Sequence, residues 1–174
     1  MKTSQNHFRK SRIQLIFSLI LISGLFFASC NKTEDTLEQN KQLAVAYVHS
    51  FAVSIGAAVV DITDEAERIA YIRRAIDPIS FYPDSSGYLF VYDYDCNNIA
   101  HARQKNLQGT SLYNYTDSKG MYVVREMVAL SETGGGFITY WWIKPGETGE
   151  KEKLGYVEPI PNTNYFIVTG VYLE

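Results

Sequence analysis

The pattern of apolar and polar positions divides the chain into a helical first part and a strand-rich second part. From Leu37 to Val60, apolar residues recur every three or four positions, which predicts an amphipathic helix. A second helix is expected from Thr63 or Asp64, either of which can cap its first turn, to about Ala75. Five expected strands follow, so the fold class is α+β on an antiparallel sheet.

The stretch Gly87–Arg103 is the clearest strand pair. Period-two spacing places four rings on one face, those of Tyr88, Phe90, Tyr92 and Tyr94. Asp95–Asn98 supplies turn formers, and Ile99–Arg103 then returns as a second strand. The same spacing predicts that Ile99, His101 and Arg103 share a face. Such a pair of strands would form a wall for a small polar ligand.

The rest of the chain is predicted to complete the sheet. Gln104–Thr116 is expected to be a loop, and Met121–Leu130 a helix that ends before three glycines. The remaining strands are expected at Phe137–Ile143, Leu154–Ile160 and Tyr165–Leu173. We expect the side chains of Leu43, Phe51 and Ile55 on the N-terminal helix to pack on the sheet face opposite the ligand.

The N-terminal segment has the pattern of an export signal and is therefore not expected to be part of the folded domain. Basic residues precede an apolar run of 16 residues, Ile13–Ala28, which is short for a membrane span. The ending Ala28-Ser29-Cys30 resembles a bacterial lipobox, which implies a lipid on Cys30. The alternative is a simple signal anchor with an incidental cysteine. We therefore expect a signal peptide over 1–29, a tether over 30–36 and a folded domain over 37–174.

Charge and cysteine content narrow the function further. Removing Lys2, Arg9, Lys10 and Arg12 from 16 basic residues leaves 12 against 19 acidic residues, a net charge of −7. That balance argues against nucleic acid as a partner. With Cys30 lipidated, Cys96 has no partner for an intramolecular disulfide.

Motifs for catalysis and metal binding are missing or explained otherwise. Asp93-Tyr-Asp95-Cys-Asn97 has the oxygen spacing of a calcium loop, but Asn98 and Gln104 stand where such a loop needs Gly and Glu. The triple glycine is not followed by the Lys-Ser/Thr of a phosphate loop. We therefore expect no metal, no cofactor and no enzymatic activity.

The strands also carry a group of polar and aromatic residues that could bind a ligand. The alternative is that these side chains only pack in the core. The candidate ligand-binding residues are Tyr88, Tyr92, His101, Arg103, Tyr140, Trp142, Lys153 and Tyr156.

These residues lie within motifs that together resemble the single Cache sensor domains of bacterial chemoreceptors and histidine kinases. The motifs are Ser86–Asp93, Ala100-His101, Asn106–Gly109, Asp117–Gly120, Gly134–Tyr140, Trp142, Lys153–Val157 and Thr169–Leu173. The resemblance implies a long N-terminal helix packed on a five-stranded antiparallel PAS-like sheet. It also implies a pocket for small organic molecules, often short carboxylates, on the other sheet face.

The leading hypothesis is a lipid-anchored extracytoplasmic sensor domain that binds a small carboxylate and signals through a membrane receptor or kinase partner, for example in chemotaxis. We expect Lys153 to hold the anion, assisted by His101. The alternative is a structural or adaptor lipoprotein that retains the Cache fold without a ligand.

Overall fold

The structure is a computed structural model that describes residues 34–173. Cys30 and the predicted signal peptide lie outside the described residues, as does the first part of the tether. The chain divides into two units, Met1–Asn40 and Lys41–Glu174. Of the first unit, residues 34–40 are described and are helical. The second unit contains all the described strands.

The elements described within residues 34–173 are three α-helices, one short 3₁₀ helix and a sheet of five strands. In order they are the N-terminal helix Glu34–Val59, α2 Glu65–Ile76, β1 Phe90–Asp93, β2 Asn98–His101, η1 Lys105–Leu107, α3 Val123–Glu132, β3 Gly136–Ile143, β4 Glu150–Pro159 and β5 Tyr165–Tyr172.

The N-terminal helix is apolar along one stripe that is buried in the domain. Val48, Ala52, Ile55 and Val59 are each no more than 1% exposed and recur every three or four residues. By length and composition this helix could also span a membrane. Its buried stripe instead belongs to a cluster that includes Ile167 of β5, so the helix from Lys41 onward is a core element of the domain.

Helix α2 begins where the sequence predicts. The Asp64 carboxylate accepts a hydrogen bond from Glu67 N at 2.8 Å, which caps the first turn. The helix ends at Ile76, and Arg73 Nε donates to the carbonyl of Ile99 at 2.8 Å. Helix α2 is thereby tied to β2.

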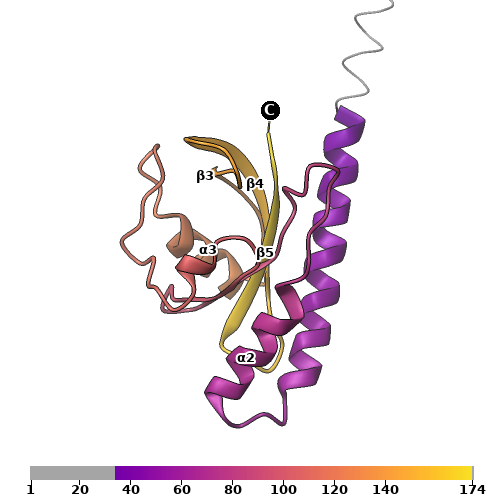
Figure 1. Ribbon diagram of the computed structural model, residues 1–174, viewed down its shortest axis with the longest axis vertical. Helices are drawn as coiled ribbons and strands as arrows, with labels where there is room; N and C mark the ends of the chain where they lie inside the picture. Colours follow the sequence, from indigo (N-terminus) through magenta and orange to yellow (C-terminus); the bar gives the residue numbers. More distant parts are fainter. Residues whose placement is uncertain (1–33, 174) are drawn as a thin grey trace, which may run out of the picture. The chain divides into compact units, whose positions relative to one another are not determined.

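The sheet is antiparallel with strand order β2-β1-β5-β4-β3, so the last strand of the chain lies at its centre. Each face is covered by different elements, with α2 on one side of β5 and α3 on the other (Figure 1). We call these the helix face, which is covered by the N-terminal helix and α2, and the ligand face, which is covered by α3. The predicted α+β fold is confirmed.

Alternation along the strands sorts side chains between the two faces. Tyr88, Phe90 and Tyr92 belong to the core on the ligand face, whereas Leu89 and Val91 belong to the core on the helix face. Ile138, Tyr140 and Trp142 share the ligand face in the same way. The face assignment predicted for β1 is therefore confirmed, and β3 follows the same alternation.

The prediction that Ile99, His101 and Arg103 share a face is wrong. The pairing of β1 with β2 shifts by one residue, since Val91 lies opposite Ala100 but Tyr92 lies opposite Asn98. Ile99 is therefore the extra residue of a β-bulge and joins the core on the helix face. His101, opposite Phe90, lies on the ligand face.

Several predicted boundaries also change. Helix α3 starts at Val123 rather than Met121, and β4 starts at Glu150 rather than Leu154. On the N-terminal helix, Ile55 is 1% exposed and Phe51 packs against the same core, as predicted. Leu43 is 39% exposed, so the prediction that it packs on the sheet is wrong.

The difference between Ile55 and Leu43 provides a matched test of the packing on the helix face. Ile55→Ala should lower the free energy of unfolding by about 2–5 kcal/mol, because it leaves a cavity in the core. Leu43→Ala on the same helix should change it by less than about 0.5 kcal/mol. Urea unfolding of both variants measures this, and equal losses would show that the stripe is misassigned.

Candidate functional site

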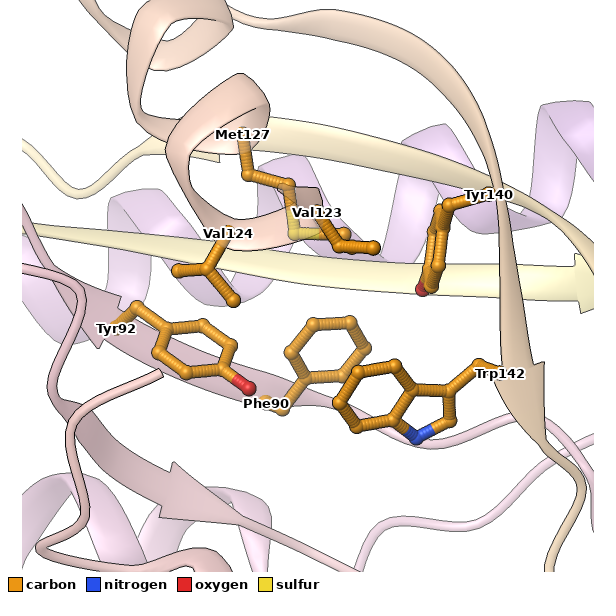
Figure 2. Close-up of a pocket in the computed structure, with 7 residues that line it drawn as sticks. All are labelled: Phe90, Tyr92, Val123, Val124, Met127, Tyr140 and Trp142. Atoms are coloured by element: carbon orange, nitrogen blue, oxygen red, sulfur yellow. The ribbon is translucent and has the colours of Figure 1, made fainter. Parts of the chain in front are cut away.

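A small cavity lies between the ligand face of the sheet and helix α3 (Figure 2). Its volume is about 10 Å³, which is room for about one water molecule. Its lining residues come from β1, α3 and β3 and are Phe90, Tyr92, Val123, Val124, Met127, Tyr140 and Trp142. The walls are therefore mainly apolar and aromatic, with the tyrosine hydroxyls and the indole N–H as polar groups.

Lys153 lies on β4 directly opposite Tyr140 of β3, which lines this cavity. Its side chain is fully buried, and Nζ has no hydrogen-bond partner within residues 34–173. The amine instead faces three rings, with Nζ 3.9 Å from the ring centroid of Tyr88, 4.7 Å from that of Tyr172 and 5.4 Å from that of Phe90. Burial lowers the pKa of Lys153 well below its usual value.

The three rings around the amine also contact other parts of the ligand face. Phe90 also lines the cavity, so the amine and the cavity share a wall. The Tyr88 and Tyr172 hydroxyls are 3.1 Å apart, and the Tyr172 hydroxyl donates to the carbonyl of Ile143 at 3.0 Å. Both rings are therefore held in place by hydrogen bonds that do not involve the amine.

His101 packs against the same aromatic wall, with ring centroids 5.1 Å from Tyr88 and 5.3 Å from Phe90. Its Nδ1 accepts hydrogen bonds from the backbone N–H groups of Arg103, at 3.3 Å, and Gln104, at 2.9 Å. Because Nδ1 must be unprotonated to accept, the neutral ring carries its proton on Nε2. Burial, and next the nearby charge of Lys153, lower the pKa of His101 to about 3.

The polar atoms of two residues that line the cavity, Trp142 and Tyr140, differ in whether they have a hydrogen-bond partner. Trp142 Nε1 donates to Gln104 Oε1 at 2.8 Å, which fixes the indole. The buried Tyr140 hydroxyl has no hydrogen-bond partner among the described residues. In Figure 2 this hydroxyl points toward Phe90 and Trp142, so it is a polar group available to a bound molecule. Burial raises the pKa of Tyr140 well above its usual value, so the hydroxyl stays protonated.

The segment that carries α3 over the cavity is tied back to the sheet by carboxylates. Asp117 is buried and accepts from the backbone N–H groups of Lys119, Met121 and Trp141 at 2.9–3.0 Å. Glu150 of β4 accepts from the Tyr115 hydroxyl at 2.8 Å and from Ser118 N at 2.7 Å. These bonds hold the cover of the cavity against β3 and β4.

Of the eight residues predicted from the sequence, the structure brings six together on the ligand face. Tyr92, Tyr140 and Trp142 line the cavity, and Tyr88, His101 and Lys153 lie around the ring of Phe90, which also lines it.

The other two predicted residues lie elsewhere. Arg103 is exposed, and its Nη2 donates to Ser80 Oγ at 3.3 Å and to the carbonyl of Ser85 at 3.2 Å. Tyr156 packs against the core on the helix face and contacts Phe137, with ring centroids 4.9 Å apart. It stands three residues after Lys153 in one strand, and this odd spacing places it on the opposite face.

The structure adds residues that the sequence did not single out. Phe90 and Tyr172 complete the rings around the amine, and Gln104 orients both His101 and Trp142. Val123, Val124 and Met127 form the α3 wall. Strand alternation could have indicated Tyr172, which shares its face with Phe166 and Val168. No sequence signal pointed to Gln104.

Metal binding has no support in the described part of the chain. Within residues 34–173, no group of three or more His, Cys, Asp or Glu side chains could hold a metal ion. Asp93, the first residue of the calcium-like motif, accepts instead from Asn97 N at 2.7 Å and from Asn97 Nδ2 at 2.8 Å. Cys96, not an asparagine, adopts the left-handed conformation of the turn, with φ 65°.

Comparison with known proteins agrees with this arrangement. A family model described as Cache domain matches residues 2–174. The sensor histidine kinase MctS of Rhizobium johnstonii is 31% identical over 170 residues, which cover 93% of this chain and 37% of the kinase. The chain therefore spans little more than a third of the length of that relative.

Two solved structures extend the similarity to three dimensions. A methyl-accepting chemotaxis protein from Vibrio parahaemolyticus superposes with a TM-score of 0.69 and 26% identity, covering 81% of this chain and 93% of that one. A second structure is described as the basis for carboxylic acid recognition by a Cache chemosensory domain. It has a TM-score of 0.62 and 25% identity, covering 87% of this chain and 98% of the other.

The lowered pKa of His101 predicts a specific acid sensitivity. Between pH 6.5 and about 3 the unfolded chain binds a proton at this residue and the folded protein does not, so stability decreases as the pH falls through this window. From about pH 7.5 to about pH 5 the loss due to His101 should be roughly 2 kcal/mol.

His101→Gln keeps an acceptor for the two backbone N–H groups but cannot titrate. Urea unfolding of the variant and the wild type at both pH values isolates the effect of His101, because the other titrating groups are common to both. The variant should lose about 2 kcal/mol less on acidification. The same loss in both proteins would contradict the burial of a neutral imidazole.

Proposed function

This chain belongs to the Cache domain family, and we propose that it is an extracytoplasmic sensor domain that binds a short organic carboxylate. The observation that carries the proposal is the Lys153 amine, which is fully buried beside a small cavity without a hydrogen-bond partner within residues 34–173.

A carboxylate is the ligand chemistry that suits this amine. An ammonium offers three donors, and aromatic rings satisfy its charge in part but accept no strong hydrogen bond. A carboxylate that leaves water needs charge-assisted donors to replace its hydration. The Tyr140 hydroxyl is a second available donor, and the Nε2–H of His101 is a third candidate.

The cavity sets the size and character of the rest of the ligand. Its volume of about 10 Å³, room for about one water molecule, is far below the roughly 300–1,000 Å³ of sites for drug-sized ligands, so even a short acid must displace side chains to enter. Val123, Val124 and Met127 of α3 present only apolar groups to it. A short acid with a small apolar part would place its carboxylate at Lys153 and that part against α3.

The comparisons support a sensing role and add the ligand class by analogy. The matched relatives are a sensor histidine kinase and chemotaxis proteins, and one similar Cache domain is described as recognising carboxylic acids. We propose that this domain signals through a membrane receptor or kinase partner and performs no catalysis itself.

The same proposal includes membrane attachment through a lipid on Cys30, which the lipobox-like ending supports. Multiple acyl chains, at about 0.8 kcal/mol per buried methylene, would make that attachment effectively permanent.

The role of Lys153 can be tested by ligand-induced stabilisation. A short acid bound at 100 times its dissociation constant should stabilise the fold by about 2.7 kcal/mol, a shift of several degrees in the unfolding midpoint. Lys153→Met keeps most of the stem and removes the charge, so it should abolish the shift while the domain still folds. A thermal-shift screen of acetate, propionate and succinate measures this.

Lys151→Met is the matched control. Lys151 lies on the same strand, and its side chain is 53% exposed, so this variant should keep the full shift. If Lys153→Met binds the same acid with unchanged affinity, the assigned role is wrong. If none of the acids shifts the wild type at millimolar concentration, the adaptor hypothesis without a ligand takes precedence.

The anchor is tested separately. Cys30→Ala should prevent lipidation and leave the precursor unprocessed, because the thiol is the attachment point. Detergent-phase partitioning with mass spectrometry of the N-terminus measures both effects. A variant of mature size that partitions like the wild type would show that Cys30 is not the anchor.

A further inference from the structure

Two glycines face each other in the floor of the site. Gly155 of β4 lies directly opposite Gly170 of β5 in the antiparallel pairing. Alternation places Gly155 on the same face as Lys153, and Gly170 on the same face as Tyr172, which belongs to the core of the ligand face. The centre of the sheet therefore has two neighbouring positions without side chains on its ligand face.

Space, rather than backbone conformation, is what these positions require. Neither glycine has a positive φ. A Cβ added at Gly155 would lie 2.9 Å from Cε1 of the buried Tyr140 ring, and one at Gly170 would lie 3.0 Å from Cε of Lys153. The space above the glycine pair is thus occupied by Tyr140 and Lys153, which, with Asn98, are the residues within 34–173 whose buried side-chain polar atoms lack hydrogen-bond partners.

We propose that Gly155 and Gly170 are positioning residues, which set the Tyr140 hydroxyl and the Lys153 amine at the places where they receive the ligand. This inference rests on the proposed function, since it assigns roles within the same binding site. Gly155 acts on Tyr140, and Gly170 acts on the stem of Lys153.

Gly155 offers the cleaner test. Its next nearest contacts beyond Tyr140 are the Thr169 carbonyl at 3.4 Å and Ile138 Cγ2 at 3.6 Å, both without severe overlap, so Gly155→Ala displaces mainly the Tyr140 ring. At Gly170 a Cβ would also lie 2.6 Å from the Leu154 carbonyl, so a substitution there would disturb the backbone itself.

The experiment is a double-mutant cycle of Gly155→Ala with Tyr140→Phe, with propionate as the probe and calorimetry as the measurement. Gly155→Ala alone should weaken binding roughly tenfold or more, the range for a lost hydrogen bond to a charged group. In the Tyr140→Phe background the ring remains but the hydroxyl is gone, so Gly155→Ala should have little further effect on affinity.

The propionate affinity and the unfolding midpoint together distinguish an effect on the position of the Tyr140 hydroxyl from a general loss of stability. Gly155→Ala should lower the unfolding midpoint equally with Tyr or Phe at position 140, because the ring overlaps in both. If it also weakens propionate binding equally in both, the hydroxyl is not what Gly155 positions and the proposal is overturned.

A readout without ligand keeps the inference testable if the proposed function fails. In protein labelled with ¹³C-tyrosine, Gly155→Ala should move the ring resonances of Tyr140, assigned by their loss in Tyr140→Phe. The resonances of Tyr92, on β1, should move much less. Unchanged Tyr140 resonances would overturn the proposal, whereas absence of propionate binding by the wild type would overturn only the carboxylate assignment.

Discussion

The ligand face of this domain is organised around the buried amine of Lys153 on β4, whose burial is energetically unfavourable. Transfer of an ammonium out of water without hydrogen-bonded partners is strongly unfavourable, and burial accordingly lowers the pKa of Lys153. Three rings surround Nζ and compensate part of that cost through their quadrupoles. The rings cannot replace hydrogen bonds to water, and the anionic ligand proposed above would supply them.

Much of the surrounding structure follows from keeping that amine and its rings in place. The Tyr88–Tyr172 hydroxyl contact holds two of the rings, and the backbone N–H groups after β2 hold the His101 imidazole in its neutral form. A charged imidazole at this place would repel Lys153. Asp117 and Glu150 attach the segment before α3 to β3 and β4, which holds that helix against the sheet.

The sequence predicts those features of the fold that depend on local periodicity, such as which side chains of a strand share a face. The ring face of β1 and the Tyr140–Trp142 face of β3 required only period two. The Ile99 bulge could not be predicted, because it depends on the register between β1 and β2. The error at Tyr156 was avoidable, since its odd spacing from Lys153 already excludes a shared face. Gln104 and the α3 wall depend on how a long connection folds back, which is set by tertiary bonds to Asp117 and Glu150.

The central place of β5 connects the two faces of the domain. Phe166, Val168 and Tyr172 contribute to the core on the ligand face, while Tyr165 and Ile167 pack with the N-terminal helix and α2. Because successive residues of one strand serve both cores, any shift of β5 caused by a ligand near Tyr172 must also disturb the packing on the helix face. Tyr172 contacts the amine and is also the last residue of β5, so the site lies where the strand leaves the sheet. One strand, β5, therefore links the surroundings of the amine to the cores on both faces of the sheet.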